Sequence, residues 1–267
     1  MRTAVMLVVV ALIAVLGWQY RYVFMPAPEP ALSSTSAEAG DPVPAASNNT
    51  GPRHLLQPEP VRDRDTGELV PLPTLGDSDA WFLLALTDLF GSDTGSVFLK
   101  AALIDRLVAT IDSLPRSHTP ETIRPVTRLA EPFRAAEVGD MLLLGPENFA
   151  RYDALVARFA AADTNEIVLT YRRFYPLFQE SYQRLGYPNA YFNDRVVEVI
   201  DHLLETPQIE GPLQLTRPNV LFKFADKELE ALSSGQKLLL RMGNEHATTM
   251  KHVLRELRAK IIASPTN

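Results

Sequence analysis

The chain has 267 residues, of which 46% are hydrophobic and 22% are charged, as is typical of a globular protein with a real core. Its net charge of −6 excludes general nucleic-acid binding, because that function needs a basic surface to replace the counterions of the phosphate backbone. The absence of cysteine excludes disulfides, thiolate metal sites, a cysteine nucleophile and a lipid-modified N-terminal cysteine.

The N-terminal segment has the composition of a membrane-spanning helix. Residues 3–20 carry no charge, and a helix of this length spans roughly 27 Å, close to the thickness of a hydrocarbon core. Trp18 and Tyr22 lie where an interfacial aromatic belt is expected. A cleavable signal peptide would have small residues after the apolar run, whereas the bulky sequence GWQYRYVFMP stands there. The sequence therefore predicts an uncleaved signal anchor over residues 1–25 that contacts the membrane through residues 4–18.

The next segment has the composition of a linker. Residues 26–66 are rich in Pro, Ala and Ser, which predicts a disordered, semi-extended tether. A globular domain is expected over residues 67–262, followed by a disordered tail over 263–267. Arg2 and the N-terminal amine favour a cytoplasmic N-terminus, although Arg21 beyond the apolar run weakens this bias. This order predicts a single-pass protein of the bacterial inner membrane with its C-terminal domain in the periplasm.

Helical periodicity dominates the region after the tether. Residues 77–79 (DSD) supply an N-cap and an acidic first turn before the apolar run WFLLALTDLF, and Gly91 ends that helix. Apolar residues then recur at helical spacing over residues 97–111, which predicts one long central helix closed by Pro115.

Shorter elements interrupt the helical pattern. The Gly-Asp turn within residues 133–144 predicts a small β-hairpin, and Pro146 begins a helix predicted to continue to Phe159. Residues 213–224 are predicted to be extended, with Pro218 confining any strand to a sheet edge. The expected fold is therefore mainly α: a compact multi-helix domain with a small β-hairpin or edge strand, behind an N-terminal transmembrane helix.

Polar residues mark the starts of the remaining helices. Asp163 or Thr164 is expected to cap one of them, Asp226 another, and residues 233–235 (SSG) to break the chain before KLLLRM. Gly243 ends that piece. The final helix is expected to bury one face, formed by Met250, Val253, Leu254, Leu257 and Ile261.

The helix that follows Asp163 is the most aromatic part of the chain. At helical spacing, five aromatic side chains fall in a stripe about 100° wide. This stripe is the candidate ligand or partner surface: Tyr171, Phe174, Tyr175, Phe178 and Tyr182. It is either a docking surface or apolar ligand groove, or helix packing with tyrosine hydroxyls at the rim, which is the commoner use of this spacing.

One motif raises the question of an aspartic protease. Asp93-Thr94-Gly95-Ser96 and Asp65-Thr66-Gly67 both match the sequence around a catalytic carboxylate of that class. A protease needs this motif in a tight loop of a β-rich lobe, whereas Asp93 follows a helix-ending glycine and precedes a helical pattern. We interpret Asp93 as a helix cap and the following residues as a turn.

Other catalytic and cofactor signatures are missing from the sequence. The histidines have no pair at i, i+4 spacing of the kind that binds zinc: His54, His118, His202, His246 and His252. There is no Walker or dinucleotide-binding glycine pattern and no G-x-S-x-G elbow. The sequence therefore predicts no cofactor, no metal site and no catalytic residue.

Three long strings carry a resemblance to a known family: VATIDSLPR, YRRFYPLFQESYQRLGYPNAYFNDRVVEVIDHLL and RPNVLFKFADKELEALSSGQKLLLRMG. They resemble an uncharacterised proteobacterial family, domain of unknown function 3014, over most of the region after about Leu69. The resemblance implies a membrane-anchored envelope protein of unassigned activity. It brings no catalytic residues to this chain.

The expected function is that of a membrane-anchored periplasmic helical domain that acts as a non-enzymatic interaction module in the cell envelope. Its partner would be an envelope protein or a cell-wall component. Two alternatives remain open at this point. One is an apolar small-molecule binder along the aromatic helix. The other is a hydrolase with an acid pair, such as Asp93 and Asp194, that sequence cannot identify.

Overall fold

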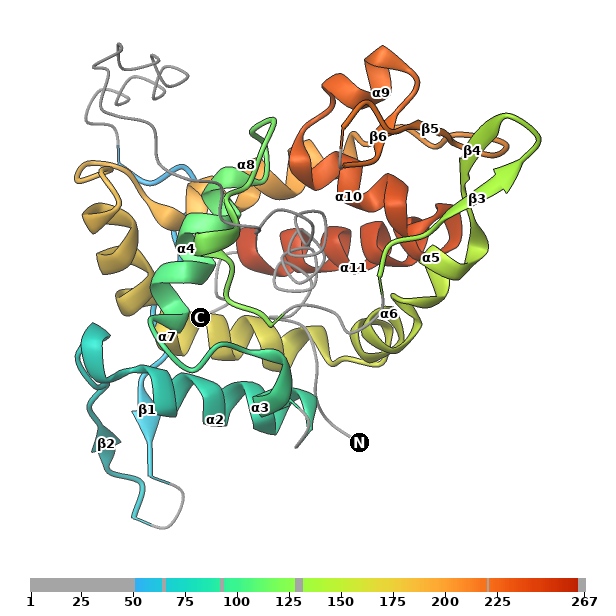
Figure 1. Ribbon diagram of the computed structural model, residues 1–267. Coiled ribbons are helices and arrows are strands. Elements are labelled where there is room, and N and C mark those ends of the chain that lie inside the picture. Colours follow the sequence, from blue (N-terminus) through green and yellow to red (C-terminus); the bar gives the residue numbers. More distant parts are fainter. Residues whose placement is uncertain (1–50, 64–65, 92–93, 128–131, 220, 264–267) are drawn as a thin grey trace, which may run out of the picture.

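The computed structural model of the protein describes residues 51–63, 66–91, 94–127, 132–219 and 221–263 (Figure 1). The predicted membrane anchor, residues 26–50 of the predicted tether, and both Asp65 and Asp93 lie outside these ranges. Within the described ranges, no helix is both long enough and apolar enough to cross a membrane.

The described chain is mainly helical, as predicted. The longer helices are α2 (Asp79–Phe90), α4 (Leu103–Ser113), α6 (Asp153–Ala160), α7 (Thr164–Arg184), α8 (Phe192–Leu204), α10 (Ser234–Met242) and α11 (Asn244–Ile262). The short helical pieces are η2 (Leu75–Asp77), α3 (Thr94–Val97), η3 (Glu121–Ile123), α5 (Pro146–Ala150) and α9 (Lys227–Ala231). α7 continues through Pro176 without ending.

The caps predicted at Asp163 and Asp226 are confirmed, whereas α2 begins at Asp79 without a side-chain cap bond from Ser78. Asp163 Oδ1 accepts from the backbone N–H of Asn165 at 2.8 Å at the start of α7. Asp226 Oδ1 accepts from the backbone N–H of Glu228 at 2.8 Å at the start of α9. Ser233 and Gln236 form a reciprocal capping box that begins α10. Gly91 ends α2 with φ of 89°, a left-handed conformation that favours glycine.

The prediction of one central helix from residue 97 is wrong. The chain leaves α3 at Phe98, which forms an isolated antiparallel bridge with Val126, and α4 begins only at Leu103. The reason is a cap supplied from a distant segment: the Asp79 carboxylate accepts the backbone N–H groups of Ala102 and Leu103 at 2.8 and 2.7 Å. Helical spacing of apolar residues continues across the break because both pieces face the same core.

The helix predicted from Pro146 to Phe159 is also divided in two. α5 ends after Ala150, and α6 begins at Asp153. Between them the backbone N–H of Tyr152 donates to the carbonyl of Phe149 at 2.9 Å, an i to i−3 bond that tightens the chain and buries the tyrosine ring.

Two small antiparallel sheets stand at opposite ends of the helical body (Figure 1). β1 (Val61–Arg62) pairs with β2 (Leu69–Val70), and a four-stranded sheet has the order β3 (Ala135–Val138), β4 (Met141–Leu144), β5 (Gln214–Thr216), β6 (Lys223–Phe224). β3 and β4 are the predicted hairpin, turning at Gly139. The prediction that Pro218 confines its strand to an edge is wrong, because Pro218 follows β5 and β5 lies between β4 and β6.

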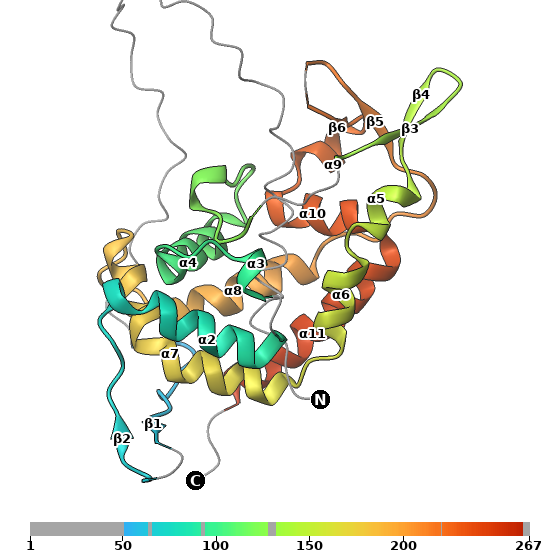
Figure 2. The ribbon, with the colours of Figure 1, turned by 60° about the horizontal axis from the view of Figure 1, so that its bottom comes forward.

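The core lies where α7 crosses the other long helices. α7 contacts α2, α4, α8 and α11, and α2 runs beside it in both views (Figures 1 and 2). Phe82 of α2 places its ring 5.0 Å from Phe174 and 5.5 Å from Phe178 of α7. The predicted apolar face of α11 is buried in this core, and a separate small cluster of Leu144, Leu215, Phe224 and Leu240 lies under the four-stranded sheet.

Candidate functional site

The aromatic stripe of α7 lies in the core of the helical body. Its members are each at most 9% exposed: Tyr171, Phe174, Tyr175, Phe178 and Tyr182. Phe178 contacts Phe192 of α8 with a ring separation of 5.8 Å, and Tyr182 stacks on Tyr187 at 4.6 Å. The stripe therefore packs against α2, α8 and the turn after α7, which is the arrangement of the helix-packing interpretation.

Two tyrosine hydroxyls of the stripe, those of Tyr171 and Tyr175, donate hydrogen bonds within the protein. Tyr171 donates to Asn193 Oδ1 at 3.2 Å, and Tyr175 donates to Gln179 Oε1 at 3.2 Å. Burial raises the pKa of Tyr175 to about 12 and raises the pKa of Tyr171 well above its usual value. Both hydroxyls therefore stay protonated at neutral pH, which suits a positioning role and does not suit a general base.

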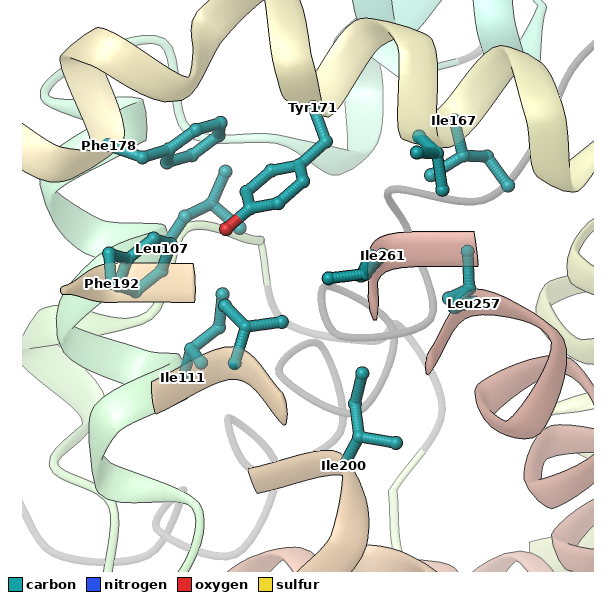
Figure 3. Close-up of a pocket in the computed structure, with 11 residues that line it drawn as sticks. Leu107, Ile111, Ile167, Tyr171, Phe178, Phe192, Ile200, Leu257 and Ile261 are labelled. Atoms are coloured by element: carbon teal, nitrogen blue, oxygen red, sulfur yellow. The ribbon is translucent and has the colours of Figure 1, made fainter. Parts of the chain in front are cut away.

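An apolar cavity of about 50 Å³ lies beside the stripe (Figure 3). Tyr171 and Phe178 point into it from α7, opposite Ile111 of α4, Ile200 of α8 and Leu257 of α11. An engineered cavity of about 150 Å³ holds benzene, and pockets for drug-sized ligands begin near 300 Å³. At this size the cavity is a packing void and does not accommodate an apolar ligand of ordinary size.

A buried ion cluster joins α4, α8 and the turn after α7. The Asp112 carboxylate is 3% exposed and accepts from Arg116 Nη2 at 2.7 Å, Arg195 Nε at 2.9 Å and the Tyr187 hydroxyl at 3.2 Å. Arg195 also donates to the Asp112 backbone carbonyl at 2.8 Å. Burial and the Asp112 charge raise the pKa of Tyr187. Because three donors already bond to the Asp112 carboxylate, we interpret the cluster as a structural link between α4 and α8.

This cluster could be read only in part from the sequence. Asp112 and Arg116 have the i, i+4 spacing of a helical ion pair, which is a visible local signal. The stronger partner, Arg195, comes from a segment 83 residues away, and nothing in its local spacing indicates the contact.

Asp194, one of the two acids of the hydrolase alternative, binds backbone. Its Oδ2 accepts from the N–H of Arg53 at 3.0 Å and its Oδ1 accepts from the N–H of His54 at 2.8 Å. Asn193 Nδ2 donates to the His54 carbonyl at 2.8 Å. Asp194 therefore fastens the chain that leads into the domain, and Asp93 lies outside the described residues.

Replacing Asp194 with alanine is expected to free this part of the chain. Losing two hydrogen bonds to a charged acceptor costs about 1–3 kcal/mol of local stability, which corresponds to a roughly five- to hundredfold faster tryptic cleavage after Arg53. Limited proteolysis followed by mass spectrometry measures the rate. Glu180→Ala, which removes an exposed acid of α7, is the control and is expected to leave cleavage unchanged. An unchanged rate in Asp194→Ala would show that other contacts hold the segment.

The sequence patterns did not indicate one contact between a serine and a histidine. His202 Nε2 lies 2.8 Å from Ser233 Oγ, and burial lowers the pKa of His202. Ser233 Oγ also accepts from the backbone N–H of Gln236 at 3.2 Å as the cap of α10. The hydroxyl is buried and committed to the helix cap, so this pair stabilises the start of α10. Among the described residues, no group of three or more His, Cys, Asp or Glu side chains is placed to hold a metal ion.

Comparison with known proteins shows which family the chain belongs to and does not assign an activity. A model of the family described as "Protein of unknown function (DUF3014)" matches residues 103–258, from the first residue of α4 into α11 and over more than half of the chain. No curated protein and no solved structure matches the chain significantly. The match covers α7 with its aromatic stripe, the Asp112 cluster and Asp194. The chain therefore belongs to the DUF3014 family.

Proposed function

We propose that the chain is a non-enzymatic interaction module of the bacterial cell envelope. In this proposal, residues 4–18 anchor it in the inner membrane, the Pro-rich segment predicted as a tether over residues 26–66 links the anchor to the domain, and the helical domain contacts an envelope protein or a cell-wall component in the periplasm. The uncharged run over residues 3–20 supports the anchor, and the composition after it supports the tether.

The observation that carries this proposal is the way the chain joins the domain. Beyond the bonds of Asp194, the N–H of Glu59 donates to the Arg172 carbonyl at 3.1 Å, and Arg172 Nε donates to the Gln57 carbonyl at 2.9 Å. Leu56 is buried in the main core. The chain is thus fastened to α7 and α8 from residue 53 onward, so the described end of the tether predicted as disordered over residues 26–66 is packed on the domain. A tether that ends in a fixed attachment holds a domain at the membrane while leaving its other faces free for a partner.

The chemistry of the described residues favours binding over the two alternatives. Asp194, the described member of the acid pair considered for a hydrolase, has both carboxylate oxygens bonded to backbone N–H groups, which disfavours it as a catalytic acid or base. The cavity beside the aromatic stripe is about 50 Å³, which disfavours an apolar small-molecule binder.

Reporter fusions test the membrane topology. Alkaline phosphatase fused after Asn267 is expected to be active in intact cells, and a green fluorescent protein that folds only in the cytoplasm is expected to stay dark. Leu7→Arg combined with Val10→Arg should remove the chain from the membrane and abolish phosphatase activity, since each arginine costs about 2.5–3.5 kcal/mol at a helix centre. Leu7→Ile with Val10→Leu is the matched control. A fluorescent, phosphatase-inactive fusion would reverse the orientation.

Cross-linking in intact cells tests the interaction. The full chain treated with formaldehyde is expected to give a discrete heavier species, and the Leu7→Arg, Val10→Arg variant should lose it because its domain no longer reaches the periplasm. Monomer alone in the wild-type chain, or the same adduct in both chains, would contradict an envelope interaction module.

A further inference from the structure

A pocket of about 130 Å³ opens between α11 and the loop that joins α8 to β5. Five polar or charged side chains line it: Gln208, Asn244, Thr248, Lys251 and Arg255. A cavity of about 150 Å³ holds benzene, so this pocket has room for the terminal group of a larger ligand. All five except Lys251 are exposed, so the rest of such a ligand can extend into solvent.

Two hydrogen bonds hold the loop against the first turns of α11. Asn244 Nδ2 donates to the Ile209 carbonyl at 2.7 Å, and Lys251 Nζ donates to the Thr206 carbonyl. These bonds also determine which polar atoms remain for a ligand. Because Asn244 uses its amide nitrogen in the loop contact, its Oδ1 remains as an acceptor. Lys251 has three ammonium N–H donors, so one bond to a carbonyl leaves donors for an anion.

The two cations of the pocket have no acidic partner within the described part of the chain. Lys251 and Arg255 are four residues apart on α11 and therefore share one face of the helix. Among the described residues, the hydrogen bond of Lys251 goes to a carbonyl, and Arg255 forms no hydrogen bond or ion pair. Burial lowers the pKa of Lys251, and the charge of Arg255 lowers it further. An anion in the pocket would therefore meet two cations that no described carboxylate neutralises.

The acids of the surrounding segments are placed outside the pocket. On the following turn of α11, Arg258 Nη2 donates to Asp201 Oδ2 at 2.9 Å, and His252 Nε2 lies 3.3 Å from Glu256 Oε1. Three further acids of the loop and of α11 are exposed and do not line the pocket: Glu205, Glu210 and Glu245. The positive charge of Lys251 and Arg255 is therefore a local feature of a chain whose net charge is −6.

We propose that this pocket binds the C-terminal carboxylate of a peptide, whose oxygens accept from Lys251 and Arg255. The planar guanidinium of an arginine matches the two oxygens of a carboxylate. Asn244 Oδ1 accepts the N–H of the last peptide unit, a donor that a phosphate ester lacks. Leu240 and Ala247 line the same pocket and offer an apolar wall to a small terminal side chain. This inference goes beyond the proposed function, because it concerns the purified chain and holds wherever the anchor places the domain.

Calorimetric titration of the full chain in a non-ionic detergent tests the pocket. The probe is N-acetyl-alanyl-alanine, which ends in a free carboxylate, and sodium chloride keeps the ionic strength constant. We expect saturable binding, and we expect the C-terminal amide of the same peptide to bind about tenfold more weakly because its end carries no charge. Arg255→Gln is expected to weaken binding of the acid about tenfold, since it removes one charge-assisted donor, and to leave binding of the amide unchanged.

Arg255 is exposed and bonds to no other described residue, so its replacement should leave the domain folded. Arg184→Gln is the matched control, because Arg184 is an exposed arginine at the end of α7 that does not line the pocket. Binding that does not saturate would overturn the proposal. Equal binding of the acid and the amide, or an equal loss in Arg255→Gln and Arg184→Gln, would overturn it as well.

Two further ligands distinguish the source of the anion. The α-amide of N-acetyl-glutamate carries its carboxylate on the side chain, and inorganic phosphate carries no carboxylate. Weaker binding of both than of N-acetyl-alanyl-alanine supports recognition of a peptide C-terminus. If the glutamate amide binds as tightly or more tightly, the pocket recognises an acidic side chain and the choice of a C-terminus is wrong. If phosphate binds as tightly or more tightly, the choice of a carboxylate is wrong.

Discussion

Phe178→Ala is expected to lower the free energy of unfolding by about 3–5 kcal/mol. Phe178 is 1% exposed, and its ring lies 5.5 Å from that of Phe82, 5.6 Å from Tyr171 and 5.8 Å from Phe192. It also lines the apolar cavity, so the space vacated by the ring joins a void that is already present. Urea unfolding of the full chain in detergent, followed by circular dichroism, measures the loss.

Two controls separate packing from other effects. Phe178→Leu restores most of the volume and is expected to cost less than about 1.5 kcal/mol. Leu185→Ala removes a side chain that is 43% exposed at the end of α7 and is expected to change stability by less than about 0.5 kcal/mol. The enlarged cavity of Phe178→Ala should also bind benzene, which would raise its unfolding midpoint. A stability loss below about 1 kcal/mol would mean that the stripe is not the centre of the core.

Local capping chemistry explains why so many boundaries could be predicted from the sequence. Asp163, Asp226 and Ser233 each cap a backbone N–H two or three residues away, so the signal and its effect lie within one turn of chain. α4 is different, because the carboxylate that caps it belongs to Asp79, 24 residues before Leu103. A periodic apolar pattern reports which face is buried and does not report where a distant cap begins a helix.

Local sequence patterns also fail to report how distant segments complete the candidate functional residues. The aromatic stripe was visible because its members recur at helical spacing, and its burial depends on α2 and α8, which come from distant parts of the sequence. Arg53 meets Asp194 across 141 residues. Charges brought together by tertiary folding leave no local spacing for a sequence pattern to detect.

Asp112→Ala is expected to destabilise the protein by about 3–5 kcal/mol, because it leaves Arg195 buried without its carboxylate. The Arg195 side chain is 17% exposed and also contacts Glu198 at 3.3 Å, a weaker partner that is itself 44% exposed. Arg116, by contrast, is 46% exposed and can turn to solvent when the carboxylate is lost. Denaturant unfolding measures the effect, with Glu198→Ala as the control that removes the exposed partner of Arg195 together with its contact to the exposed Arg53 side chain.

A double-mutant cycle identifies Arg195 as the group that carries this cost. Asp112→Leu combined with Arg195→Met replaces the buried pair with apolar side chains, and such replacements are often neutral or stabilising. The double variant is therefore expected to be more stable than Asp112→Leu alone, although it carries one more substitution. If the two losses simply add, the buried charge of Arg195 is not the source of the instability. The cluster would then act through hydrogen bonds to Arg116 and Tyr187, and the link between α4 and α8 would depend on the turn after α7.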